Sequence, residues 1–110
     1  MKKRLPAPTE KQIQAGIVRS LRQIGAGVYD TSQPHRALIT PGLPDLLVFF
    51  RGRFAFAEVK RPGGRLTPGQ RAFRAECQDA GVPFHVWRST EEALEWALET
   101  TPSTPTQEER

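Results

Sequence analysis

Residues 43–60 read LPDLLVFFRGRFAFAEVK, and this stretch decides the fold because two apolar runs flank a short basic connection. Asp45–Phe50 and Phe54–Lys60 predict two antiparallel strands, since short glycine-containing links such as Arg51–Gly52–Arg53 are typical of hairpins. The first strand is apolar on both faces after its opening aspartate, which predicts a covered central strand. The hairpin therefore carries an acid at its entrance and charged residues at its far end. Burying such groups is costly unless each has a partner or a metal.

The pairing of the two strands decides whether the acids meet. If Phe50 pairs with Phe54 across a three-residue turn, counting outward places Leu46 opposite Glu58. Asp45 is then one residue out of register. A bulge or a one-residue shift would bring the two carboxylates to one side.

Two converging carboxylates, Asp45 and Glu58, would form a site for a hard cation such as Mg²⁺ or Mn²⁺, held partly by waters. Alternation places Lys60 on the same strand face as Glu58. A metal with an adjacent lysine suits phosphodiester hydrolysis, because the ion polarises the phosphoryl group and the lysine orients water or offsets charge. Taken singly, an acid after a proline is commonly a strand-entry residue, and Glu-x-Lys is common on solvated strands.

Outside the hairpin, helix and strand signals alternate along the chain. Thr9 and Gln12 suggest a capping box that opens a helix ending before Gly25, and Thr67 with Gln70 suggests a second. The remaining segments are a short strand over 28–31, a loop over 32–44, a strand over 82–87 and a helix after Ser89. The order α-β-β-β-α-β-α predicts an α/β fold with a mixed sheet flanked by helices.

Several isolated polar residues have structural explanations as well as functional ones. Glu10 falls within the apolar stripe of the first helix, yet an acid in a first turn is also favoured by the helix dipole. Gln70 is explained as a capping residue. Neither His35 nor His85 has a second histidine at metal-binding spacing. Cys77 is the only cysteine, which excludes an intrachain disulfide, and it reads as a small core residue.

The composition indicates one basic domain. The net charge of +4 is uneven, because the segment 51–74 holds seven basic residues against one acid. Such a segment attracts polyanions, although it could also serve only solubility. No apolar run reaches membrane-spanning length and residues 1–8 lack a signal-peptide core, so we expect a cytoplasmic protein without membrane contact. Residues 1–8 should be a flexible basic arm, and 100–110 a disordered tail.

The succession of "GLPD", a hairpin, "EVK", a glycine-rich basic loop and "LTPGQ" resembles the VRR-NUC family of the PD-(D/E)xK nuclease superfamily. The resemblance extends from about Thr9 to Leu98. It implies a single restriction-endonuclease-like domain over residues 9–99. It also implies Mg²⁺ or Mn²⁺ as the cofactor, with no organic cofactor.

By this resemblance, Asp45 and Glu58 would be metal ligands and Lys60 the catalytic lysine. Val59 would offer its backbone carbonyl to the metal, and Glu10 would complete the metal's surroundings.

Gln70 would match the active-site glutamine of the family and could hold a water or a phosphate oxygen. The loop 31–44 has no match, so its role stays open. Phosphate contacts are expected from six arginines: Arg51, Arg53, Arg61, Arg65, Arg71 and Arg74.

The leading hypothesis is a metal-dependent endonuclease that hydrolyses phosphodiester bonds in branched DNA, such as four-way junctions, in DNA repair or recombination. Single-domain relatives implied by the resemblance act as homodimers, and a two-fold dimer would supply the second cut that a junction needs. Phe54, Phe56 and Trp96 are candidates for the dimer surface. The alternatives are a nucleic-acid-binding module without catalysis and a restriction-type nuclease that cuts duplex DNA.

Overall fold

The computed structural model describes residues 6–32 and 42–99, and this part of the chain contains three helices and four strands in the predicted order. Their bounds are α1 Glu10–Gln23, β1 Gly27–Asp30, β2 Leu46–Phe50, β3 Arg53–Val59, α2 Pro68–Ala80, β4 Phe84–Trp87 and α3 Thr90–Ala97. Most of the predicted arm and the predicted tail, and most of the loop 31–44 with His35, lie outside the described residues.

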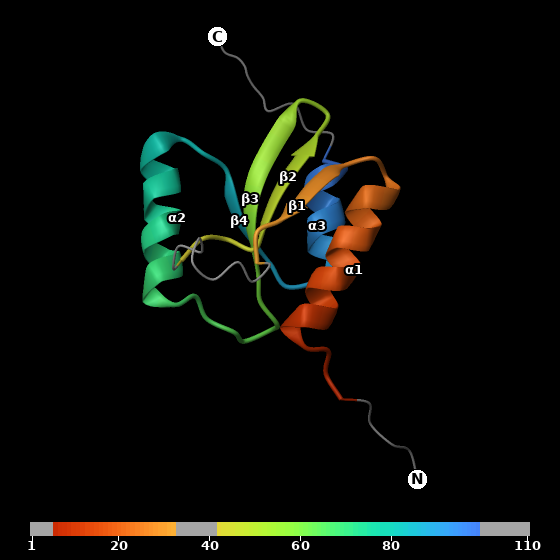
Figure 1. The fold of residues 1–110 in the computed structure, drawn as a ribbon, viewed down its shortest axis with the longest axis horizontal. Helices are drawn as coiled ribbons and strands as arrows, with labels where there is room; N and C mark the ends of the chain where they lie inside the picture. The colour runs from red at the N-terminus through yellow and green to blue at the C-terminus, as the bar shows by residue number, and fades with distance from the viewer. Residues whose placement is uncertain (1–5, 33–41, 100–110) are drawn as a thin grey trace.

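The four strands form one mixed sheet in the order β1-β2-β3-β4. β2 is antiparallel to both β1 and β3, whereas β4 runs parallel to β3 after the crossover through α2. α1 and α3 lie on one side of the sheet and α2 lies on the other (Figure 1). The predicted fold class is therefore confirmed.

The helix ends follow from local sequence. Thr9 accepts from the backbone of Gln12, whose side chain returns a bond to the Thr9 amide, and Thr67 and Gln70 repeat this capping box at α2. Each box satisfies two backbone N–H groups that the first turn of a helix leaves without partners. α2 ends at Gly81, as expected of a glycine with φ near 73°.

The core lies between the sheet and the helices α1 and α3. Ile17, Leu21, Leu46 and Val48 are fully buried there. Trp87 and Trp96 join this core, and their ring centroids are 5.7 Å apart. His85 lies beside both tryptophans on the same sheet face, where burial lowers its pKa.

The opposite face of the sheet is only partly covered. Phe73 of α2 packs on Phe56 and Phe84 with ring centroids 5.1 and 6.1 Å away. Tyr29 and Phe49, on the β1–β2 half of this face, are 60% and 45% exposed. The prediction that β2 is covered on both faces is therefore wrong, because α2 packs on the β3–β4 half.

The turn between β2 and β3 has two residues and not three. Phe50 pairs with Arg53, so only Arg51 and Gly52 form the turn, with φ of 53° and 76°. Positive φ at both positions is the geometry that matches the twist of a two-residue hairpin. The predicted register was wrong by one residue: Leu46 pairs with Ala57, and the next step outward brings Asp45 opposite Glu58 without a bulge.

Candidate active site

The charged end of the hairpin lies where several chain segments meet. β2 begins and β3 ends at the same end of the sheet, and both α1 and α2 have their N-termini at this end (Figure 1). Helix N-termini carry partial positive charge, which favours anionic groups nearby. This end of the sheet therefore gathers residues that are far apart in the sequence.

Asp45 is held in place by its neighbours on both sides. Its carboxylate oxygen Oδ2 accepts a hydrogen bond of 2.9 Å from the Val59 amide, so the side chain replaces a backbone acceptor at the end of the ladder. Its carbonyl accepts from the Thr31 amide at 2.8 Å, and the Thr31 hydroxyl donates to the Pro44 carbonyl. Thr31 is a positioning residue that the sequence did not reveal.

Glu58, Lys60 and Gln70 converge beside it. Only 2% of Glu58 is exposed, and its Oε2 accepts a 2.7 Å hydrogen bond from Gln70 Nε2. Lys60 is also buried, with Nζ 4.0 Å from the same oxygen. Gln70 caps α2 through its Oε1, as predicted, and its amide nitrogen holds Glu58, a contact that the sequence did not indicate. Its predicted contact with a water or a phosphate oxygen stays a prediction.

A close glycine contact fixes the segment that leads into Asp45. Gly42 has φ near 91°, and a Cβ placed on it would lie 2.5 Å from the carbonyl oxygen of Gly69. No side chain fits that space, and the backbone conformation itself disfavours other residues. The "GLPD" and "TPGQ" segments are thus packed directly against each other, which explains the glycine at position 42.

Glu10 lies at the border of this centre. Its Oε2 is 3.5 Å from the position of a Cβ on Gly64, and that position is 3.6 Å from Lys60 Cβ. The negative charge of Glu10 is also close enough to raise the pKa of Asp45. Arg88 braces the intervening loop by donating to the carbonyls of Arg61 and Gly64 at 2.9 and 2.8 Å.

Burial dominates the titration of the two central carboxyls. It raises the pKa of Asp45, although the Val59 amide and the Lys60 ammonium oppose the rise. Burial, reinforced by the charge of Asp45, raises the pKa of Glu58 to about 8. Without a cation, Glu58 is therefore largely protonated at pH 7.

The pair has the properties of a cation site. Glu58 Oε1 is buried and has no hydrogen-bond partner among the described residues. A divalent cation would supply this missing partner and favour the ionised form of both acids. In the described part of the chain no three His, Cys, Asp or Glu side chains gather as a ready metal cluster. Two carboxylates completed by water and substrate oxygens are the usual setting for Mg²⁺.

The six arginines expected to contact phosphates separate into two groups. Arg61, Arg65, Arg71 and Arg74 follow β3 on the loop and on α2, which begins at the site. Arg51 and Arg53 lie at the hairpin turn, at the other end of the strands. Arg53 is held there by α3, since it donates to the Trp96 carbonyl at 2.9 Å and pairs with Glu99 at 3.3 Å.

The VRR-NUC domain model matches residues 9–91 of this chain. A solved structure described as a VRR_NUC domain superposes with a TM-score of 0.66 at 24% identity, covering 84% of this chain and 99% of the other. A second, a VRR_NUC domain protein, gives 0.61 at 19% identity and covers 83% and 86%. These structural likenesses establish the fold alone. No curated protein matches the chain. Because the domain model spans most of its length, the chain belongs to the VRR-NUC family of nuclease-type domains.

Proposed function

We propose that this protein is a metal-dependent endonuclease that hydrolyses phosphodiester bonds in branched DNA, including four-way junctions. The observation that supports it best is the buried pair Asp45 and Glu58: Glu58 Oε1 has no hydrogen-bond partner among the described residues, and Glu58 Oε2 lies 4.0 Å from Lys60 Nζ. Two acids exposed to water would need no cation to balance them, whereas a buried pair does. In a simple DNA-binding module, two acids beside the DNA would repel its phosphates.

Asp45, Glu58 and the Val59 carbonyl would hold Mg²⁺ or Mn²⁺, with Glu10 at the border of its surroundings. When bound, such an ion supplies positive charge that polarises the scissile phosphoryl group. Lys60 holds its ammonium group at the same place, where it orients the attacking water and offsets negative charge developing on the phosphoryl oxygens.

Gln70 acts through Glu58. Its 2.7 Å bond to Oε2 leaves Oε1, which is buried and has no partner among the described residues, as the oxygen available to a ligand. The water attacks phosphorus, the P–O bond to the leaving strand breaks, and the products are a phosphate end and a hydroxyl end. DNA would be held by the arginines nearest this centre, Arg61, Arg65, Arg71 and Arg74.

We also propose that two copies act together, because one chain has one such centre and a junction needs two cuts. Of the predicted surface residues, Phe56 packs on Phe73 and Trp96 is only 8% exposed, so both are unsuited. Phe54 is 40% exposed and its ring lies 6.1 Å from Phe49. The exposed aromatic side chains Tyr29, Phe49 and Phe54 are the surface that a second copy would cover.

The test uses labelled duplex, flap and four-way-junction DNA with the purified protein, in EDTA and in Mg²⁺ or Mn²⁺. We expect symmetrical, metal-dependent cuts in the junction. Lys60→Ala should abolish cleavage while junction binding is retained, and Arg51→Gln, at the far end of the sheet, should reduce cleavage far less.

Uncut DNA under every metal condition would leave only the binding module. A defined pattern of cuts in plain duplex would instead identify a restriction-type enzyme. Light scattering of Phe49→Ser next to wild type tests the dimer separately, since loss of the dimer should not remove metal binding.

A further inference from the structure

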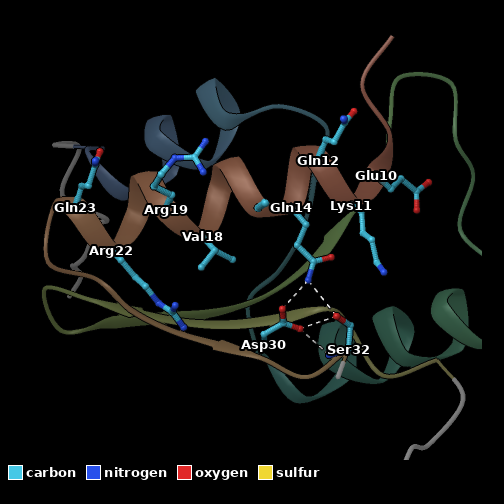
Figure 2. Close-up of a pocket in the computed structure, with 11 residues that line it drawn as sticks. Glu10, Lys11, Gln12, Gln14, Val18, Arg19, Arg22, Gln23, Asp30 and Ser32 are labelled. Atoms are coloured by element: carbon cyan, nitrogen blue, oxygen red, sulfur yellow. Dashed lines mark hydrogen bonds between the residues drawn. The ribbon is translucent and has the colours of Figure 1, made fainter. Parts of the chain in front are cut away.

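An open groove of about 1090 Å³ lies between α1 and the edge strand β1. Figure 2 shows Lys11, Gln14, Val18 and Arg22 extending from the helix towards the strand, with Asp30 facing them. Glu10 lines one end of this groove and also lies at the border of the candidate active site, so the groove adjoins that site.

The helix side of the groove is one continuous stripe. Lys11, Gln14, Val18 and Arg22 recur at the three- and four-residue spacing that places side chains along one face of a helix. From Lys11 to Arg22 the stripe is roughly 16 Å long at about 1.5 Å per residue. That length corresponds to about five nucleotide steps at the roughly 3.4 Å axial spacing of a stacked strand.

The groove presents mainly donors to an occupant. Lys11 is exposed, and among the described residues Arg22 donates from one guanidinium nitrogen, to the Val28 carbonyl at 2.8 Å. Two acids line the groove, and Glu10 lies at its active-site end. Asp30 is already engaged: its two oxygens accept from Gln14 and from the amide and hydroxyl of Ser32 at 2.6–3.1 Å (Figure 2). Away from Glu10, an anionic backbone therefore meets two cations, Lys11 and Arg22, and little repulsion.

The same donor from Arg22 makes the edge of β1 a poor template for another strand. The Val28 carbonyl points to the outside of the sheet and is occupied by the arginine. A blocked edge disfavours addition of a peptide strand. Nucleic acid is thus favoured over a peptide as the occupant.

We propose that the α1–β1 groove holds the DNA strand on one side of the scissile phosphate, with Lys11 and Arg22 contacting successive phosphates. This rests on the proposed nuclease function and extends it. The enzyme grips its substrate on two sides of the active site: through α2 and its preceding loop, and through α1. The sequence segment 51–74 accounts only for the first of these.

Binding is measured with four-way junctions in the Lys60→Ala background, so that the DNA stays intact. Adding Lys11→Gln and Arg22→Gln should weaken binding roughly tenfold at low salt and lower the salt slope by about 1.5, since two phosphate contacts are lost. This binding defect should disappear when the junction arm on the groove side is shortened so that the DNA ends at the scissile phosphate.

Arg19→Gln is the control on the same helix, because it removes one positive charge from a side chain that borders the groove without entering it. The guanidinium of Arg19 points away from β1 (Figure 2) and lies 3.9 Å from the position of a Cβ on Gly16, towards α3. Its variant should bind within about twofold of the parent.

A cross-link keeps the proposal testable if Arg22→Gln folds poorly. In the Lys60→Ala background, Ala15→Cys in the groove should form a disulfide with thiol-tethered DNA on one side of the cut only, whereas Ala80→Cys at the end of α2 should not. Equal binding by the Lys11/Arg22 and Arg19 variants, or no cross-link at residue 15, overturns the groove assignment. Dissociation of a dimer by the Lys11/Arg22 change would show that a second copy fills the groove. If wild type cuts no DNA at all, the proposed function itself fails.

Discussion

The two ends of the β2–β3 hairpin differ in whether their charged side chains have partners. At the turn, Arg53 is balanced by Glu99 and its guanidinium lies 4.3 Å from the centre of the Trp96 ring. At the open end, Glu58 and Lys60 are buried, and one carboxylate oxygen has no partner within the described residues. Protein interiors normally satisfy buried polar atoms, so an end that fails to do so is arranged for a ligand. The turn end stabilises the fold, and the open end is where chemistry is expected.

The largest effect should come from Glu58→Gln, which keeps the shape of the open end and removes its charge. We expect cleavage to fall by at least about a hundredfold, because an ion would lose one of two carboxylate ligands. Added Mg²⁺ or Mn²⁺ should raise the melting temperature of wild type and not of the variant. An equal rise in both proteins would show that the metal binds elsewhere.

The same pair should make the metal-free protein sensitive to pH. The pKa of Glu58 is about 8 in the folded protein and near 4.5 in an ordinary setting. Between these values the unfolded chain releases a proton that the folded chain keeps, so stability falls as pH rises from 4.5 to 8. Denaturant unfolding in EDTA at pH 5 and pH 9 should show this loss in wild type and a smaller loss in Glu58→Gln. If the stability of wild type and of Glu58→Gln changed equally with pH, Glu58 would not be a buried acid with a raised pKa.

Gly42→Ala tests how rigidly the open end is built. The new methyl group would lie 2.5 Å from the Gly69 carbonyl oxygen, in addition to the strain of a positive φ. We expect a loss of roughly 2–4 kcal/mol in unfolding free energy and weaker cleavage at permissive temperature. Gly63→Ala is the control, since its φ is 84° but nothing lies within 4 Å; it should cost about 1 kcal/mol. Similar losses of unfolding free energy in Gly42→Ala and Gly63→Ala would show that the contact between Gly42 and Gly69 contributes little to stability.

The smallest effect belongs to the turn. Arg51 has a φ of 53°, which asparagine adopts more readily than arginine. Arg51→Asn should stabilise the protein by roughly 0.5 kcal/mol, measured by chemical denaturation. A clear loss of stability would mean that the contact of Arg51 with the Phe50 ring, 4.8 Å away, matters more than the backbone strain.

Local chemistry made much of this structure predictable. The capping boxes at Thr9 and Thr67 depend on residues three positions apart, and both form as expected. The order of helices and strands along the chain followed from hydrophobic runs and glycine-rich links. The hairpin register was not predictable, because "RGR" can form a turn of two or three residues, and an arginine at positive φ is uncommon. One residue at the turn decides whether Asp45 faces Glu58 at the other end.

Features that depend on tertiary contact left no readable signal. Gly42 meets Gly69 across 27 positions of sequence, and Thr31, directly after β1, donates to Pro44, which precedes β2. The groove requires α1 to lie over the edge of β1, which no local pattern in α1 specifies. Arg53 looked like a DNA contact by charge alone, and its partner Trp96 comes from the last helix.

The two ends of one amide, in Gln70, join the start of α2 to the acid that would bind the ion. When the first turn of α2 unfolds locally, Gln70 should therefore also lose its hydrogen bond to Glu58. Binding of a divalent cation at Asp45 and Glu58 should therefore slow hydrogen exchange at the Gln70 and Arg71 amides. Exchange at these two amides would then report whether the cation is bound.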